Sequence, residues 1–445
     1  MSGAHGSSTA SAIGVDGQPG HWRLVIGLMV IYSYAFVDRV VLALLVDPIK
    51  HHLHATDGQM GLLLGLAFAL FYGAFIIPSG HFADRFDRRR LIAIASIGWA
   101  VMTIVCGTAE SFTQLFIGRA GVGLTEAVIT PAAYSLIRDA VPARSRGLAF
   151  STYALAPVLG AAASLAGGGW LLHLAIGGTF TGLPLIGALA PWQVTLVIIG
   201  LGGLPLSLLL LTFGESRRDF SADAAGGGVI KGLVSACGYI AANRALYVPL
   251  ILFAGAGAMM SFSHNAWFPT ALGRRFLMAP QQVGPILGGV YLVTGTAGLL
   301  IGGIVMNRLA RSGKSVMAYS IVAVTITALG TAAACIAPSA AVAFAFAGFT
   351  MLFLGISNPA GATQLSQATP PEMIGRVSAV YLLFQTMVGQ TLGPLSVAMV
   401  SKGFFTGPSS IGYGLAVVQI GCAAIAVVCA LLMIRHGRRT ASDAQ

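Results

Sequence analysis

The sequence predicts an all-α membrane protein whose twelve membrane-spanning helices form two six-helix bundles. Three observations carry this prediction. Hydrophobic residues make up 56% of the 445 residues and charged residues only 9%, whereas an ordinary soluble domain carries about 25% charged residues. Apolar stretches of the roughly 20 residues that cross a bilayer recur along most of the chain. The two halves of the sequence also resemble each other, which indicates a six-helix unit repeated with pseudo-two-fold symmetry.

Twelve apolar stretches, bounded by turns that contain charged residues, proline or glycine, are predicted to cross the membrane. They lie near residues 22–46, 58–80, 91–109, 113–137, 147–172, 191–213, 245–271, 283–306, 315–337, 339–366, 377–400 and 411–434. The longest polar interruption falls in the middle of the chain. We therefore expect a disordered N-terminal tail (1–20), an N-terminal bundle (21–213), a cytoplasmic linker (214–244), a C-terminal bundle (245–434) and a C-terminal tail (435–445).

The distribution of positive charge orients the chain. With a cytoplasmic N-terminus, nineteen lysines and arginines in the loops and tails lie on the cytoplasmic side and four on the other side. This bias agrees with the positive-inside rule. We therefore expect a multi-pass protein of a bacterial inner membrane with both termini in the cytoplasm.

The same pattern argues against several other functions. The basic residues sit in short loops at helix ends and form no patch interleaved with aromatic residues, so nucleic acid is not an expected partner. The sequence shows no metal-ligand spacing, no P-loop lysine and no serine–histidine–acid arrangement. We expect no enzyme, no metal and no cofactor other than protons as a coupling ion, and a monomer among membrane lipids.

A short motif recurs after the second span of each half. The sequence GHFADRFDRR occupies residues 80–89, and GIVMNR occupies residues 303–308. The first copy resembles the G-x-x-x-D-R-x-G-R-R signature of the major facilitator superfamily, although Asp87 stands where that family usually has glycine. The resemblance implies two six-helix bundles around a central cavity that opens to one side of the membrane at a time.

In this motif, the glycine allows close helix packing, and the aspartate can pair with an arginine across the bundle. Such a pair would act as a latch on the cytoplasmic face while the cavity opens outward. Positive-inside anchoring is the simpler alternative. The residues assigned to the latch are Gly80, Asp84, Arg85, Arg88, Arg89, Arg146, Asn307 and Arg308.

Four charged residues inside the predicted spans are the main functional candidates. Asp38 and Arg39 lie in the first span, and Arg119 and Glu126 lie seven residues apart in the fourth. Charges in hydrocarbon are costly and usually face a partner or water. The family resemblance implies that the first and fourth helices line the central cavity, so we expect the four charges to meet there. A permanent structural cluster is the alternative.

These charges suggest how transport could be coupled to protons. Burial disfavours a charged carboxylate and a neighbouring arginine favours it, so its protonation can change as the cavity opens and closes. Asp38 and Glu126 are the candidate proton-coupling residues. Arg39 and Arg119 are candidates to bind an anionic head group.

The C-terminal half has no acidic residue inside a span, so its cavity candidates are neutral. They are Ser261, His264, Asn265, Trp267, Asn358, Gln364, Gln385 and Gln390. We assign His264 and Asn265, together with Tyr134 and Tyr153 of the N-terminal half, to substrate binding. For the histidine and the aromatic residues, structural packing is the alternative.

Two segments resemble the spinster family more narrowly. These are AFVDR at residues 35–39, continuing to the LVDPIK of residues 45–50, and RAGVGLTEA at residues 119–127. The resemblance implies a transporter of amphipathic lipids, such as sphingosine-1-phosphate or lysophospholipids, coupled to protons. The prediction is therefore a proton-coupled secondary transporter of an amphipathic lipid or small organic anion. The alternatives are a multidrug/proton antiporter and a non-transporting sensor or lipid scramblase on the same fold.

Overall fold

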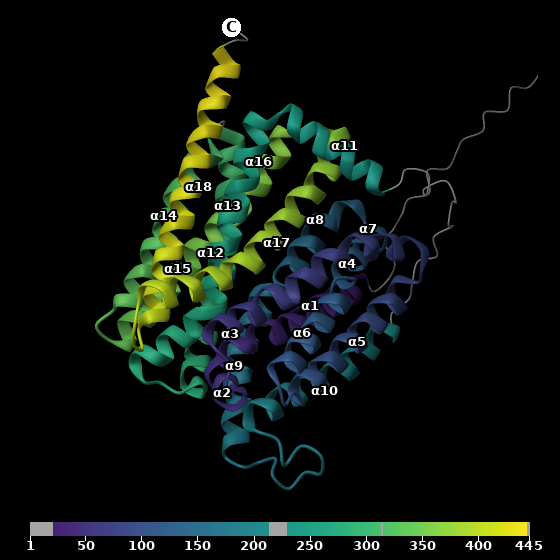
Figure 1. Cartoon of the computed structure of the whole chain (residues 1–445). Coiled ribbons are helices and arrows are strands. Elements are labelled where there is room, and N and C mark those ends of the chain that lie inside the picture. The colour runs from purple at the N-terminus through teal and green to yellow at the C-terminus, as the bar shows by residue number, and fades with distance from the viewer. Residues whose placement is uncertain (1–20, 213–228, 313–314, 443–445) are drawn as a thin grey trace, which may run out of the picture.

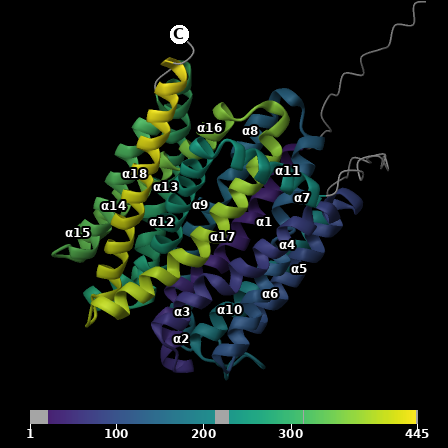
Figure 2. The same ribbon diagram turned by 45° about the horizontal axis from the view of Figure 1, so that its top comes forward.

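The structure, a computed structural model, describes residues 21–212, 229–312 and 315–442. Within these ranges the regular structure is entirely helical. The two halves of the chain lie side by side, one coloured purple to blue and the other green to yellow in Figures 1 and 2. The predicted tail at residues 1–20 and the first part of the linker lie outside the described residues.

Several helices of the N-terminal half begin at a residue whose side chain caps the helix. Thr56 and Gln59 form a capping box at the start of α3, and the Ser111 side chain accepts a hydrogen bond from the backbone of Gln114 at the start of α6. In chain order the elements are α1 (His21–Leu44), α2 (Val46–Leu53), α3 (Asp57–Leu64), α4 (Leu66–Arg85), α5 (Arg88–Gly107), α6 (Phe112–Glu126), α7 (Ile129–Ala140), α8 (Ala143–Ala154), α9 (Ala156–Ile176), α10 (Pro191–Leu209) and the short 3₁₀ helix η1 (Leu210–Thr212).

The described part of the linker forms α11 (Val229–Ala242), which lies at the top of the molecule in Figure 1. The C-terminal half then follows as α12 (Arg244–Phe276), α13 (Pro280–Ser312), α14 (Val316–Ile336), α15 (Ala340–Ser357), α16 (Pro359–Ala368), α17 (Pro371–Phe404) and α18 (Ser410–Ser442). The last helix runs through residues 435–442, so most of the segment expected to be a tail continues α18 instead.

Eleven helices or pairs of consecutive helices in the described ranges are long and apolar enough to cross a membrane. They coincide with eleven of the twelve predicted spans. The twelfth span is α17, whose 34 residues are long enough. Its centre carries Gln385 and Gln390, which make it less apolar than the others. The chain is a multi-pass integral membrane protein with twelve helical spans.

Four of the predicted spans are each divided into two helices. The divisions fall between α3 and α4, α6 and α7, α8 and α9, and α15 and α16. Pro131 lies in the first turn of α7 and Pro359 is the first residue of α16; proline fits these positions because the first backbone N–H groups of a helix have no partner within the helix. The two prolines are 228 residues apart, as are Pro142 and Pro370. The internal repeat is therefore visible in where the helices are interrupted.

The two halves contact each other mainly through four helix pairs, namely α9 with α13, α1 with α12, and α3 and α4 with α17. Glycines allow the closest approaches. A Cβ atom added at Gly288 of α13 would lie 2.7 Å from the Ala162 carbonyl oxygen of α9, and one added at Gly65 would lie 2.6 Å from the Gln390 carbonyl oxygen. Small residues at helix interfaces are the usual means of close packing in membranes.

A methyl group placed between α9 and α13 should destabilise the pairing of the halves. We expect Gly288→Ala to lower the free energy of unfolding by about 1–3 kcal/mol, because overpacking a tight interface costs that much. Gly289→Ala is the matched control, since a Cβ atom there meets nothing within 4 Å. Thermal unfolding of the purified protein measures both variants. Equal melting temperatures for the two would contradict this account of the interface.

Candidate functional site

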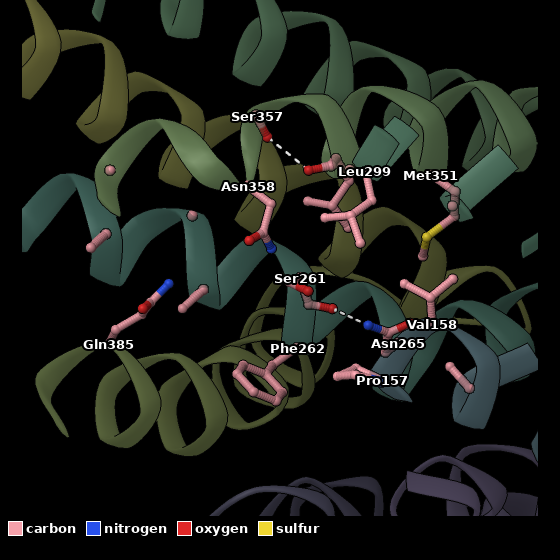
Figure 3. A pocket seen from close by; sticks show the side chains of 18 of the residues that line it. Pro157, Val158, Ser261, Phe262, Asn265, Leu299, Met351, Ser357, Asn358 and Gln385 are labelled. Carbon is pink, nitrogen blue, oxygen red and sulfur yellow. Dashed lines mark hydrogen bonds between the residues drawn. The ribbon is translucent and has the colours of Figure 1, made fainter. Parts of the chain in front are cut away.

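A cavity of about 340 Å³ lies between the two halves. Phe36 and Val40 of α1 and Pro157 of α9 line it from the N-terminal half, while most of its wall comes from the C-terminal half (Figure 3). No described residue that lines this cavity is charged. Its C-terminal wall combines large apolar side chains with neutral polar ones, namely Phe253, Phe262, Met351, Leu354, Ser261, Asn265, Tyr291, Ser357, Asn358, Tyr381, Gln385 and Thr386.

This cavity agrees with part of the sequence prediction for the C-terminal half. Ser261, Asn265, Asn358 and Gln385 all line it. The Asn265 amide group donates a hydrogen bond of 3.0 Å to the Ser261 carbonyl oxygen, shown as a dashed line in Figure 3. Trp267 instead donates its indole N–H to the Pro394 carbonyl oxygen at 2.8 Å and lies in the helix interface between α12 and α17. Asn265 is thus the one assigned substrate-binding residue that lines the cavity.

The four charged residues of the spans form two ion pairs inside the N-terminal bundle. Asp38 of α1 accepts a hydrogen bond of 2.5 Å from the Arg119 guanidinium of α6, and each of the two residues is 1% exposed. Arg119 also donates to the Arg39 carbonyl oxygen at 3.5 Å. This pair lies deep in the bundle and fastens α1 to α6.

The second pair joins Arg39 of α1 to Glu126, the last residue of α6. The Arg39 Nε atom donates to a Glu126 carboxylate oxygen at 3.0 Å, and an Nη atom lies 2.9 Å from the other oxygen. The guanidinium carbon also lies 4.2 Å from the ring centre of Phe68, 4.7 Å from that of Phe36 and 5.1 Å from that of Tyr72. Arg39 is therefore held by one carboxylate and three aromatic faces, which attract a cation.

Glycine sets the position of this aromatic group. A Cβ atom added at Gly123 of α6 would lie 3.1 Å from the Phe68 carbonyl carbon, so α4 and α6 approach closely there. The same Phe68 ring faces both Arg39 and Arg119. The break between α6 and α7 follows directly after Glu126, and the Ser79 hydroxyl of α4 donates to the Ala127 carbonyl oxygen there at 3.1 Å.

The four charges thus come together, but they do not line the cavity as predicted. The side chains of Asp38 and Arg119 are each 2% exposed, that of Glu126 is fully buried, and that of Arg39 is 9% exposed. Phe36 and Val40, which flank Asp38 and Arg39 in sequence, line the cavity instead. The prediction failed because α1 is apolar on nearly all sides, and its sequence does not show which face turns toward the cavity. Arg39 is the charged residue of the four with the most exposed side chain.

The other predicted substrate contacts also lie outside this cavity. His264 is 1% exposed and packs its ring against Phe268, with the ring centres 4.4 Å apart. Tyr153 is 1% exposed and stacks on Tyr32 at 4.9 Å. Tyr134 is 45% exposed and contacts the rings of Tyr153 and Phe150. For His264 and Tyr153 the alternative of structural packing describes the observed contacts better.

The residues assigned to the latch lie in the last turns of α4 and α13 and in the first turns of α5 and α8. Arg88 donates to Asp139 at 2.5 Å and to Ser135 at 3.0 Å, joining α5 to α7. Arg146 donates to the Val141 carbonyl oxygen. Asp87 accepts a hydrogen bond from the Arg90 backbone N–H at 2.9 Å, so the residue that replaces the usual glycine caps α5.

The remaining latch residues lie near the ends of α4, α5 and α13. Asn307 and Arg308 are exposed near the end of α13. Arg89 lies 3.4 Å from Asp87 in its own half. Gly80, Asp84 and Arg85 belong to the last turns of α4, but their side chains lie outside what the structure describes.

An ion cluster that the sequence analysis missed joins the halves at the opposite end of the molecule. Arg274, in the last turn of α12, donates to Asp47 of α2 at 2.6 and 3.1 Å and to Asp57 of α3 at 2.8 and 3.0 Å. Lys50 of α2 donates to the same Asp57 at 2.5 Å. We call Asp47, Lys50, Asp57 and Arg274 the α2 cluster. The Thr270 hydroxyl donates to the Ala43 carbonyl oxygen beside it, at 3.1 Å.

Two features of the sequence could have revealed the α2 cluster. Arg274 is one of only four basic residues expected on the side opposite the cytoplasm. It also follows Asp47 by 227 residues, close to the 228 residues that separate the repeated prolines. Equivalent residues of two repeats lie close together where the two-fold symmetry axis passes between them. The signal was overlooked because loop charges far apart in sequence can pair in many ways.

Comparison with known proteins identifies the family of this fold. A profile described as Major Facilitator Superfamily matches residues 28–394. An MFS-type efflux pump of Mycolicibacterium smegmatis is 27% identical over 97% of this chain and 98% of its own length. A probable galactarate/D-glucarate transporter of Bacillus subtilis is 25% identical over 66% of each chain.

Solved structures show the same fold. A bacterial homologue of the human lysosomal transporter Spinster, in an inward-facing and unoccupied conformation, superposes with a TM-score of 0.80 at 23% identity, covering 95% of this chain and 98% of the other. The inward-facing occupied form of a bacterial Spinster homologue gives 0.79 at 24% identity, with the same coverage. These matches confirm the fold that the motif at residues 80–89 implied.

Loss of the α2 cluster should let the halves separate at this end. We expect Arg274→Gln to raise the ratio of open to closed molecules up to about fivefold, because partly exposed ion pairs are worth up to about 1 kcal/mol. Distances between spin labels at His54→Cys and Phe404→Cys, with the exposed Cys237 replaced, measure this ratio. Arg275→Gln is the matched control, since Arg275 donates to Ala337 and Ser409 within its own half. An unchanged distance distribution in Arg274→Gln would contradict the role of the cluster.

Proposed function

The chain belongs to the Major Facilitator Superfamily, whose members are transporters and not enzymes, and we propose that it moves an amphipathic lipid or organic anion by proton-coupled alternating access. The observation that carries the proposal is the pairing of Arg39 with Glu126 beside the cavity. Ionised side chains are rare in membrane spans and mark functional sites by default. The proposed location is a bacterial inner membrane, with both termini in the cytoplasm.

Exchange of partners by Arg39 would couple substrate to protons. Its side chain is the most exposed of the four, and the cavity-lining Phe36 packs against it. An anionic group that draws the guanidinium away would leave Glu126 buried without its partner. A buried carboxylate without a partner becomes neutral by binding a proton. Release of the anion would reverse both steps.

Asp38 and Arg119 would support this exchange from deeper between α1 and α6. Their pair is the more deeply buried, and breaking such a pair costs several kcal/mol because it leaves a buried charge without a partner. We propose that this pair keeps α1 against α6 while Arg39 moves, and that protonation of Asp38 would release the helix.

The two halves would move relative to each other so that the cavity opens to one side of the membrane at a time. The contacts between them at the α2 cluster and the glycine interfaces close one end of the molecule. With positive loops in the cytoplasm, we propose that this end faces outward and that the cavity opens inward. The latch residues would close the cytoplasmic end when the α2 cluster opens.

The substrate class is supported by two features. The cavity wall is rich in aromatic and aliphatic side chains, which suit an acyl chain, and its polar groups are neutral. A relative is described as a probable galactarate/D-glucarate transporter, which is consistent with an organic anion. Membrane lipids surround the protein, and we propose that it acts as a monomer.

A multidrug/proton antiporter is the second candidate. The relative described as an efflux pump matches along nearly the full length of both chains. A cavity without charge and with several aromatic rings also suits apolar drugs. The two candidate functions differ in how the ligand interacts with Arg39. The guanidinium would attract an anionic lipid, whereas it would repel a cationic drug.

Removing the charge of Glu126 should uncouple transport. In proteoliposomes with an imposed pH gradient, we expect Glu126→Gln to abolish gradient-driven accumulation of a lysophospholipid while leaving exchange between equal substrate pools. Glu110→Gln, at an exposed position, is the matched control. Accumulation equal to that of the unmodified protein would remove Glu126 from the mechanism. Passive equilibration that needs no gradient would instead indicate a scramblase.

Truncation of Arg39 should separate the two candidates. We expect Arg39→Ala to weaken binding of a phosphate-bearing lysolipid by about tenfold or more, because charge-assisted hydrogen bonds are worth about 1.5–3 kcal/mol. Binding of a cationic drug should change less. Titration calorimetry measures both, with Arg90→Ala at an exposed position as control. The opposite ranking would favour the antiporter.

A further inference from the structure

Glu126, Thr130 and Tyr134 form a polar stripe along the fourth span. The three residues are four positions apart, so they occupy one side of the helical path that α6 and α7 form together. The path stays helical across the break, because Ala127 and Val128 both have right-handed helical backbone angles. The stripe therefore runs from the fully buried Glu126 carboxylate to Tyr134, which is 45% exposed.

Two buried hydroxyl groups beside this stripe have no hydrogen-bond partner among the described residues. They are the Thr130 Oγ1 atom and the Oη atom of Tyr153 on α8. The Thr130 side chain lies within reach of the Tyr153 and Tyr32 hydroxyls, but it completes no hydrogen bond of good geometry with Tyr153. A buried polar group without a partner is costly, and such groups are the usual ligands of buried water molecules.

Ring contacts hold these hydroxyl groups in place. Tyr153 stacks on Tyr32 with the ring centres 4.9 Å apart, and Tyr134 meets the Tyr153 ring edge-on at 5.5 Å. Tyr32 in turn contacts Phe36, whose ring centre lies 4.7 Å from the guanidinium carbon of Arg39. Side chains of α1, α7 and α8 thus connect the exposed Tyr134 with the surroundings of Arg39.

Most titratable groups around the stripe are buried. Those that face Glu126 or the hydroxyl groups come from α1, α4, α6, α7 and α8, and Tyr134 is the most exposed of them. They are Tyr32, Asp38, Arg39, Tyr72, Arg119, Tyr134 and Tyr153. A proton that reaches Glu126 along the stripe would therefore enter at Tyr134. With the orientation proposed above, this is the cytoplasmic end.

We propose that Thr130 and Tyr153 bind water and carry protons between Glu126 and the Tyr134 end of the stripe. In each transfer, a water molecule gives one proton to the Glu126 Oε1 atom and receives one from the next hydroxyl group, whose proton is replaced from the exposed end. One proton enters, one proton arrives, and no bond to carbon changes. The inference rests on the proposed function, since it supplies the proton that Glu126 takes up.

Removal of the Thr130 hydroxyl group should slow the proton step. In proteoliposomes with an imposed pH gradient, we expect Thr130→Val to lower the initial rate of lysophospholipid accumulation about tenfold or more, because a positioned proton-transfer group commonly contributes at least that much to a rate. The equilibrium affinity for the lipid should stay the same, since a route changes the rate and not the end state. Thr130→Ser restores a hydroxyl group and should recover the rate. Thr103→Val is the matched control, because the buried Thr103 hydroxyl donates to the Trp99 carbonyl oxygen within its own helix.

Deuterium distinguishes a slowed proton route from disturbed packing. We expect the rate of Thr130→Val to fall further in D₂O, relative to H₂O, than that of the unmodified protein, because proton transfer becomes rate-limiting. Tyr153→Phe should act in the same direction, and Tyr34→Phe is its control, since the Tyr34 hydroxyl donates to the Ile199 carbonyl oxygen at 2.9 Å.

Two results would overturn the route. The first is an unchanged rate and isotope effect in both Thr130→Val and Tyr153→Phe, and the second is an equal loss of affinity and rate. If Glu126→Gln still abolished accumulation, either result would leave the proposed function standing. Accumulation by Glu126→Gln at the rate of the unmodified protein would contradict the proposed function and the route together.

Discussion

Four buried charges constrain how α1 and α6 are arranged in the apolar N-terminal bundle. Hydrocarbon cannot solvate Asp38, Arg39, Arg119 or Glu126, so each must find its partner within the protein. Consecutive residues of α1 carry opposite charges, and their partners lie two turns apart on α6. A rotation or slip of α1 against α6 would bring like charges together or leave a charge alone, so the two pairs fix the register of these helices.

The halves of the molecule divide the chemistry between them. The N-terminal bundle holds the ionised groups behind Phe36 and Val40, while the C-terminal bundle supplies the neutral wall of the cavity. Glycines and the α2 cluster contribute contacts between the halves, whereas the buried ion pairs lie within the N-terminal bundle. In the transport that we propose, a substrate between the halves draws on Arg39 from one side and contacts the C-terminal wall on the other.

Much of the fold could be predicted from the sequence because apolar length and loop charge are local properties. The twelve spans and the central division follow from them, whereas the superfamily was identified by the resemblance of residues 80–89 to its motif. The breaks at Gly65 and Leu155 and after Glu126 were not predicted, since they depend on how neighbouring helices pack. The same limit explains the site. The sequence identified the four charges but not the face of α1 that turns inward, and it identified His264 without showing that Tyr291 stands between it and the cavity.

We propose that substrate binding draws Arg39 away from Glu126 and that Glu126 then takes up a proton. Infrared difference spectroscopy of the purified protein, recorded with and without a lysophospholipid, measures this step directly. We expect binding to produce the carbonyl band of a protonated carboxylic acid, and we expect this band to be absent from Glu126→Gln. A spectrum in which binding leaves every carboxyl group ionised would contradict it.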